Sequence, residues 1–268
     1  MKRLLKLIYK LLQRLISLTG WTFIVTRSRL RRNWVTSYIS SADVLMRLDL
    51  SESLDVSYAS GSVDELNIAF MKQTLNNHSV FIDVGANQGF YSLYVLKKFP
   101  GAQVVAIEPD PYSLSKLRNN LDLNSLQNGN LKIIEKAAGI SDELVTLMIN
   151  DAGNRAGSSV VLDQRLYTGK IRNTIVEVKS LPLFEILQQN HIIRVDCMKL
   201  DIEGYEFPVL KKYFEQAPFD LWPKNVLIEA IGHTIKNVGG SPISLLIEKG
   251  YTLVDHESYN YIFSSSKI

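Results

Sequence analysis

The stretch VFIDVGANQGFY, Val80 to Tyr91, decides the fold of this chain. Three apolar residues lead into Asp83, and Gly85 and Gly89 follow before an apolar run with helical spacing. This order predicts a buried strand, a tight turn and a helix. Because glycine lets the backbone turn sharply and approach a ligand closely, the turn is either a nucleotide-facing loop or an ordinary strand-to-helix connection.

Strand and helix patterns alternate from this stretch to the end of the chain. Continuous apolar strands separated by helices predict a parallel sheet that is covered on both faces. The last two strand patterns are only a few residues apart, so they must be antiparallel if they pair. We therefore expect an α/β fold with a mostly parallel seven-stranded sheet, helices on both faces and a C-terminal antiparallel hairpin. The expected strands span 80–84, 103–107, 131–135, 197–201, 226–230, 251–255 and 259–263, and the expected helices span 90–99, 111–121, 182–190, 205–214 and 242–249.

The pattern also predicts how the chain is divided. Residues 41–78 are expected to lead into the first strand, as a small hairpin or an extended segment over 43–58 and a helix over 62–75. The main domain then spans 79–268. Its alternation fails at 144–180, where two additional strands around a polar loop indicate an insertion. Insertions of this length at the ligand-binding edge are usually functional or disordered.

The first 40 residues form a basic, amphipathic segment. Residues 1–32 hold nine lysines or arginines and no acidic residue, whereas the whole chain has a net charge of +3. Cations interrupt the apolar residues, so neither a membrane-spanning helix nor a secretory signal is predicted. Two interpretations stay open: the helix lies on an anionic membrane surface, or it packs on the domain or a partner subunit. The expected location is the cytoplasm, with peripheral contact at the inner face of the membrane under the first interpretation.

The composition argues against several functions. A hydrophobic content of 46% and a charged content of 21% are typical of a globular protein. The net charge is too small to indicate nucleic acid binding, and no motif for holding a flipped base is present. Cys197 is the single cysteine, which excludes an internal disulfide and a cysteine-rich metal site. The histidines lack close ligand spacing, and no metal ligand is assigned, although Asp201 and Glu203 are compatible with Mg²⁺.

Carboxylates at the ends of strands are the strongest chemical signal. Glu108 ends the second expected strand, about 20 residues after the glycine turn, where an acidic residue accepts hydrogen bonds from ribose hydroxyls. Asp201 ends the fourth core strand, and Glu203 follows it at a turn. Ligands of open α/β sheets bind outside the carboxyl ends of the strands. One cleft is therefore expected to be ringed by Asp83, Glu108, Asp201 and Glu229.

The glycine spacing distinguishes two ligands that share the ribose contact. A dinucleotide fingerprint is Gly-x-Gly-x-x-Gly, whereas the spacing here is Gly85-x-x-x-Gly89, with Asp83 two residues before the first glycine. Asp83 would repel a pyrophosphate, but it would attract the amino group and the sulfonium of S-adenosylmethionine. The turn therefore favours a methyl donor over NAD.

The motifs DVGANQGFY, IEPDP and KLDIEGYE resemble those of the FkbM-type methyltransferases, a branch of the class I S-adenosylmethionine-dependent enzymes. The resemblance covers residues 43–263, and Lys199 to Glu206 is its most specific part. It implies a Rossmann-like methyltransferase fold, S-adenosyl-L-methionine as cofactor, and O-methylation of a hydroxyl on a sugar, glycan or secondary metabolite. The residues that it implies for cofactor binding are Asp83, Gly85, Asn87, Gly89, Phe90, Tyr91, Glu108, Pro109, Ala137, Ala138 and Asp142.

A general base would help an alcohol to accept a methyl group at neutral pH. The catalytic candidates are Asp201, Glu203 and His233, with the two carboxylates preferred as a pair. Asp201 can instead hold the amino group of the donor, and His233 can be a plain loop residue.

Two other functions stay open. One is a nucleotide-dependent oxidoreductase, against which the glycine spacing and the terminal hairpin argue. The other is a non-catalytic binding module on a methyltransferase scaffold, against which the intact carboxylates argue. The expected partner is a small-molecule or glycan acceptor and no nucleic acid, while the sequence indicates no oligomeric state.

Overall fold

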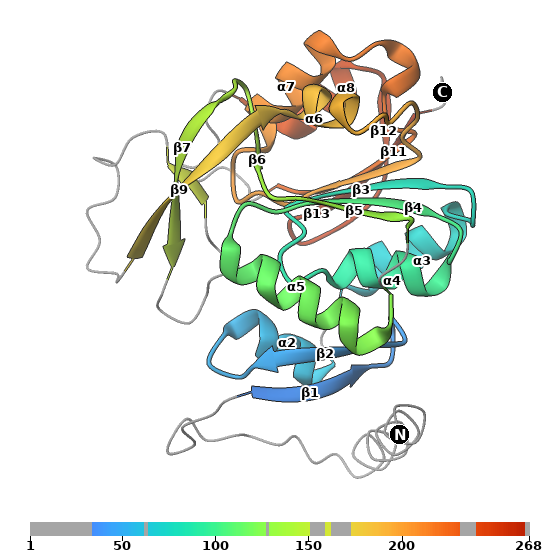
Figure 1. Cartoon of the computed structure of the whole chain (residues 1–268). Coiled ribbons are helices and arrows are strands. Elements are labelled where there is room, and N and C mark those ends of the chain that lie inside the picture. Colours follow the sequence, from blue (N-terminus) through green and yellow to red (C-terminus); the bar gives the residue numbers. More distant parts are fainter. Residues whose placement is uncertain are drawn as a thin grey trace.

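The computed structural model describes residues 34–61, 64–126, 129–150, 159–161, 173–230 and 240–265. Its centre is a seven-stranded sheet with helices on both faces (Figure 1). The strands are β3 (Val80–Val84), β4 (Gln103–Ile107), β5 (Leu131–Ile134), β10 (Cys197–Leu200), β11 (Asn225–Glu229), β12 (Tyr251–Glu257) and β13 (Asn260–Ser265). One face carries α3 (Glu65–Thr74), α4 (Phe90–Lys98) and α5 (Pro111–Asn124), and the other carries α6 (Leu183–Gln189), α7 (Glu206–Gln216) and α8 (Pro242–Glu248).

The order of the strands is β12-β13-β11-β10-β3-β4-β5. The five strands from β11 to β5 are parallel, whereas β13 is antiparallel to both β11 and β12. The predicted fold, including the C-terminal hairpin, is confirmed. The chain runs from β3 outward to β5 and then returns to place β10 on the other side of β3. Ligands bind at such a switch point in open α/β sheets.

Alternate residues of each strand pack into two apolar cores. Phe81 and Val104 belong to the core under α4 and α5, whereas Ile82 and Val105 belong to the core under α6 to α8. All four side chains are fully buried. This two-residue period also determines where the polar strand residue Asp83 points, because Asp83 must share a face with Phe81.

A second, four-stranded sheet holds the two additional strands expected at 144–180, whereas most of the polar loop expected between them lies outside the described residues. Its strands are β6 (Ala137–Gly139), β7 (Glu143–Asn150), β8 (Ser159–Val161) and β9 (Asn173–Pro182), in the order β6-β9-β7-β8. A small apolar core forms between Ala137, Leu147, Ile149 and Val178. In Figure 1 this sheet extends from one end of the central sheet.

The structure corrects the expected hairpin over 43–58. The hairpin consists of β1 (Trp34–Ile39) and β2 (Val44–Asp49), and the segment after it is helix α2 (Ser53–Ser60). Gly61 ends α2 with a φ of 83°, a backbone conformation that favours glycine. The helix expected over 62–75 is α3, which begins at Glu65 with Asp64 as its N-cap.

Residues 1–33 lie outside the described part of the chain, so the interpretations of the basic segment are not tested. Within the described residues, no helix has both the length and the hydropathy needed to cross a membrane.

Amide side chains on α5 hold the hairpin against the domain. Asn120 Oδ1 accepts a hydrogen bond from the backbone N–H of Arg47 at 2.8 Å, and Asn124 Oδ1 accepts one from that of Leu45 at 2.9 Å. Asn124 Nδ2 also donates to the Leu45 carbonyl at 2.6 Å. Two asparagines one helical turn apart therefore satisfy the free edge of β2 as a neighbouring strand would.

Replacing Asn120 with leucine is expected to lower the free energy of unfolding by about 2 to 4 kcal/mol, because one buried and one partly buried backbone group lose their partners. These are the N–H of Arg47 and the carbonyl of Gln88, to which Asn120 Nδ2 donates at 3.1 Å. Urea denaturation measures the change, with the exposed neighbour Asn119→Leu as the control. Equal stability of the two variants would show that the asparagine contributes nothing to the docking.

Candidate active site

A cavity of about 420 Å³ lies at the carboxyl ends of β3, β4, β10 and β11. This volume falls in the range of small-molecule sites. The walls come from the glycine turn after β3, the ends of the other three strands, the second sheet and helix α2. The predicted cleft at the switch point is therefore present.

The glycine turn is pressed against the end of β10. A methyl group added to Gly85 would lie 1.9 Å from the carbonyl oxygen of Asp201, and the φ of Gly85 is 81°. The backbone N–H groups of Gly85 and Ala86 both donate to the Ile107 carbonyl, at 2.9 and 3.0 Å. Only glycine fits here, because both the space and the backbone conformation exclude a side chain.

Glu108 receives two hydrogen bonds from the backbone. Its Oε2 accepts from the N–H of Asn87 at 2.7 Å, and its Oε1 accepts from the N–H of Asp110 at 2.8 Å. Burial raises the pKa of Glu108 to about 7, although both hydrogen bonds oppose this shift. Each carboxylate oxygen retains further acceptor capacity, so the group can still accept hydrogen bonds from a ligand diol.

A lysine and three carboxylates meet where β10 and β11 end. Lys199 Nζ lies 2.8 Å from Asp201 Oδ2 and 4.6 Å from the centroid of the Tyr91 ring. Oxygen atoms of Asp201, Glu203 and Glu229 lie within 4.8 Å of one another. The side chain of Lys199 is 4% exposed and that of Asp201 is 31% exposed, so the aspartate reaches the cavity.

The pKa values of Asp201 and Glu229 are shifted in opposite directions. Burial, followed by the charge of Asp201, raises the pKa of Glu229. Burial would also raise the pKa of Asp201, but Lys199 and the hydrogen bond from Glu229 outweigh it and hold this pKa below its usual value. These opposite directions favour the ionised form of Asp201 and the protonated form of Glu229.

The LDIEGYE motif forms a strained turn beside this pair. Glu203 and Gly204 both have left-handed backbone conformations, with φ values of 56° and 96°. The buried carboxylate of Glu206 holds them there, since its Oε1 accepts from the N–H groups of Ile202 and Gly204, both at 3.0 Å. Strain of this kind concentrates at functional sites. The turn places Glu203 in the cavity wall.

Most residues predicted for the cofactor line the cavity, and three do not. Asp83 is buried on the α4 face, where its Oδ2 accepts from the N–H and the hydroxyl of Ser92 at 3.1 and 2.6 Å. Gly89 faces Leu117 of α5, and Asp142 is exposed on the turn between β6 and β7. The predicted residues that do line the cavity are Gly85, Asn87, Phe90, Tyr91, Glu108, Pro109, Ala137 and Ala138.

The idea that Asp83 meets a positively charged ligand directly needs correction, because strand periodicity turns its side chain toward α4. Of the catalytic candidates, Asp201 and Glu203 line the cavity, and His233 lies outside the described residues.

The sequence prediction missed Lys199 and the whole of helix α2. Lys199 precedes Asp201 by two residues, so strand periodicity already places both side chains on one face. Helix α2 was expected to be a strand, although Gly61 is a helix-ending signal. The residues of α2 in the cavity wall are Ser53, Leu54, Ser57 and Tyr58.

The cavity is strongly acidic. Among the described residues, six carboxyl side chains line it and Lys199 is the single cation. The six are Asp64, Glu108, Asp110, Asp201, Glu203 and Glu229. Such a lining attracts a cationic ligand and repels a pyrophosphate.

Comparisons relate this chain to known proteins. A family model described as "Methyltransferase FkbM domain" matches residues 83–251. "Methyltransferase sdnD" of Sordaria araneosa is 29% identical over 181 residues, which are 58% of this chain and 67% of the relative. "31-O-demethyl-FK506 methyltransferase FkbM" of Streptomyces tacrolimicus is 26% identical over 65% of this chain and 73% of its own length. A solved FkbM methyltransferase from Methylobacillus flagellatus has a TM-score of 0.45 and 17% identity, over 71% of this chain and 44% of that one.

Proposed function

Since the chain belongs to the FkbM methyltransferase family, and is thus an S-adenosylmethionine-dependent enzyme, we propose that it methylates a hydroxyl group of a sugar, glycan or secondary metabolite. The observation that carries this proposal is the Lys199–Asp201–Glu229 group, which lies in the wall of the cavity at the switch point of the sheet. The Streptomyces relative is named as a methyltransferase of 31-O-demethyl-FK506, which is consistent with an oxygen acceptor.

The residues of the cavity fit the donor. S-adenosylmethionine, when bound, supplies an electrophilic methyl group on a positively charged sulfur. Glu108 would accept hydrogen bonds from the ribose hydroxyls, as acidic residues at this strand end do. The six carboxyl groups of the wall suit the cation, whereas they oppose the pyrophosphate of a dinucleotide. This disfavours the alternative of a nucleotide-dependent oxidoreductase.

Asp201 is the residue we assign to the acceptor. Ionised at neutral pH, it can accept a hydrogen bond from an alcohol and orient its oxygen toward the methyl carbon. The carboxylate of Asp201, paired with Glu229, would take up the hydroxyl proton of the acceptor. Lys199 keeps Asp201 ionised until then.

A labelled-methyl assay tests this function. The protein is incubated with S-adenosylmethionine and three matched panels of acceptors, which offer hydroxyl, amino or thiol groups on similar carbon frames. We expect label only in the hydroxyl panel, with glycosides included. Label confined to the amine or thiol panel would contradict the assignment, as would the absence of S-adenosylmethionine binding in calorimetry.

The affinity for S-adenosylmethionine is expected to rise about tenfold between pH of about 6 and 8. Glu108 has a pKa of about 7, and ribose hydroxyls are accepted best by its ionised form, so binding strengthens as pH rises through this value. Calorimetry at several pH values measures the effect. In Glu108→Gln the affinity for S-adenosylmethionine should no longer change with pH, and it should stay at the weak value that the wild type shows at low pH. A wild-type profile in this variant would remove Glu108 from the donor site.

A further inference from the structure

Helix α2 forms one wall of the cavity but is anchored by a charge. It contributes Ser53, Leu54, Ser57 and Tyr58 to the lining. Among its residues only Asp55 is fully buried. A helix on a protein surface usually rests on an apolar stripe. The position of this wall therefore depends on the partners of Asp55, in addition to Tyr58 and Ala59, which pack partly buried against the core under α4 and α5.

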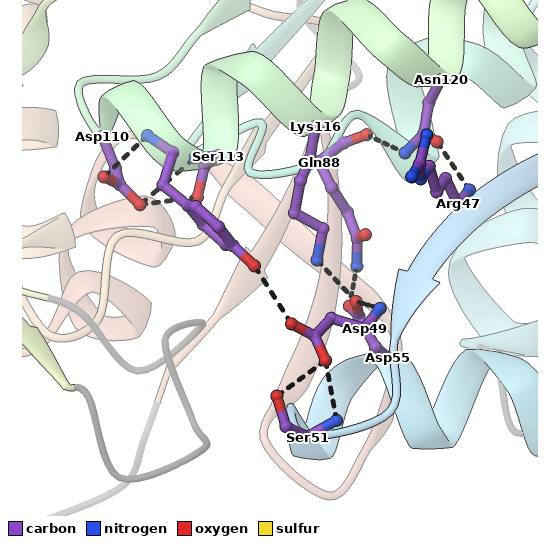
Figure 2. A network of polar contacts seen from close by, with 10 residues as sticks. Arg47, Asp49, Ser51, Asp55, Gln88, Asp110, Ser113, Lys116 and Asn120 are labelled. Carbon is purple, nitrogen blue, oxygen red and sulfur yellow. Dashed lines mark hydrogen bonds and ion pairs between the residues drawn. The ribbon is translucent and has the colours of Figure 1, made fainter. Parts of the chain in front are cut away.

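Asp55 joins three separate elements (Figure 2). Its Oδ2 accepts from Lys116 Nζ of α5 at 2.6 Å and from the N–H of Asp49, at the end of β2, at 2.5 Å. Its Oδ1 accepts from Gln88 Nε2 at 2.6 Å. The side chains of Asp55 and Lys116 are 1% and 8% exposed. Because water is excluded, these interactions are stronger than they would be on the surface.

Gln88 carries the connection into the glycine turn. It follows Asn87, and both residues line the cavity. Its backbone carbonyl accepts from Asn120 Nδ2 at 3.1 Å, so Gln88 is held through both its side chain and its main chain. A second link runs through Tyr58, one turn after Asp55, which stacks on Phe90 with ring centroids 4.8 Å apart. Helix α2 and the glycine turn are thus joined at two points.

We propose that Asp55 is a positioning residue for donor binding: through Gln88 and Lys116 it holds α2 and the glycine turn in one arrangement around the cavity. This inference rests on the proposed function, since the ligand is S-adenosylmethionine. Neither Asp55 nor Lys116 lines the cavity. An effect of these residues on affinity must therefore be transmitted by α2 and the turn.

The test uses the full chain with Asp55→Leu and Lys116→Met combined, which removes both charges and leaves no unpaired buried ion. We expect calorimetry to give about tenfold weaker S-adenosylmethionine binding. Affinity falls because helix α2 is no longer held in the arrangement that binds the ligand. Hydrogen exchange provides the readout of position. S-adenosylmethionine should protect amides 53–60 in the wild type and fail to protect them in the variant. Asp55→Asn combined with Lys116→Met, which keeps one acceptor oxygen at position 55 and leaves no unpaired buried ion, should be intermediate.

Asp196→Asn is the matched control. Like Asp55, Asp196 forms ion pairs, in its case with Arg194 and Lys224. It precedes β10, however, at the end of the sheet opposite the cavity. Its variant should keep wild-type affinity and protection. Wild-type affinity for S-adenosylmethionine in the double variant would overturn the proposal. The proposal would also fail if Asp196→Asn lost as much stability as the double variant and bound S-adenosylmethionine equally weakly. If the double variant does not fold, Gln88→Met, which spares the ion pair, must lose the protection of amides 53–60; this protection is the deciding readout, because Gln88 itself lines the cavity. Failure of the wild type to bind S-adenosylmethionine would instead contradict the proposed function.

Discussion

Gly85→Ala is expected to weaken S-adenosylmethionine binding by about 100-fold or more and to lower the free energy of unfolding by about 3 kcal/mol. The new methyl group would lie 1.9 Å from the carbonyl oxygen of Asp201. The clash can be relieved only if the glycine turn and the end of β10 move apart. Both form the cavity, so the donor site and the proposed reaction centre would be displaced together.

Gly61→Ala separates the two causes of this effect. Gly61 has nearly the same φ, 83°, but nothing lies within 4 Å of an added methyl group. The Gly61→Ala variant should therefore lose only about 1 kcal/mol of unfolding free energy, from the backbone conformation alone. Its affinity for S-adenosylmethionine should be unchanged. Calorimetry and urea denaturation of both variants measure the difference. Normal donor binding by Gly85→Ala would mean that the turn does not hold the donor.

Asp201→Asn is expected to lower the rate of methyl transfer by 10²- to 10⁴-fold, the usual range for loss of a general base. Asparagine keeps the shape of the side chain but cannot take up the proton of the acceptor hydroxyl. The affinity for S-adenosylmethionine should change much less than the rate. Single-turnover assays with a labelled methyl group separate these quantities, once the acceptor panel has provided a substrate.

Two further variants define the assignment. The exposed Asp220→Asn serves as the control and should keep the wild-type rate. Glu203→Gln should have a smaller effect than Asp201→Asn, because Asp201 is the carboxylate that Lys199 holds at 2.8 Å. A near-normal rate for both Asp201→Asn and Glu203→Gln would show that the base lies elsewhere in the cavity.

Local patterns were sufficient to predict the sheet. Residues 80–84 and 103–107 were predicted as strands and are β3 and β4. Buried strands and amphipathic helices have different periods, and both can be read from neighbouring residues. The same logic placed Glu108, Asp201 and Glu229 around one cleft, because parallel strands end at the same edge of a sheet.

The hairpin and α2 could not be assigned in this way. Helix α2 is short and has no apolar stripe, so its periodicity carries little information, and its buried contact is the polar residue Asp55. The partners of Asp55 include Gln88 and Lys116, which are 33 and 61 residues away along the chain. No local pattern indicates a contact over such a separation.

The sequence by itself determined the class of fold, the glycine turn and the edge of the sheet at which the ligand binds, since these follow from periodicity and strand ends. Only the tertiary structure decided that Asp83 supports α4 while Lys199 and Asp201 meet at the cavity, and that α2 forms one wall of this cavity. The reason is physical: a side chain's neighbours in space are set by packing between distant segments, and burial and partner charges then decide which carboxyl group keeps its proton.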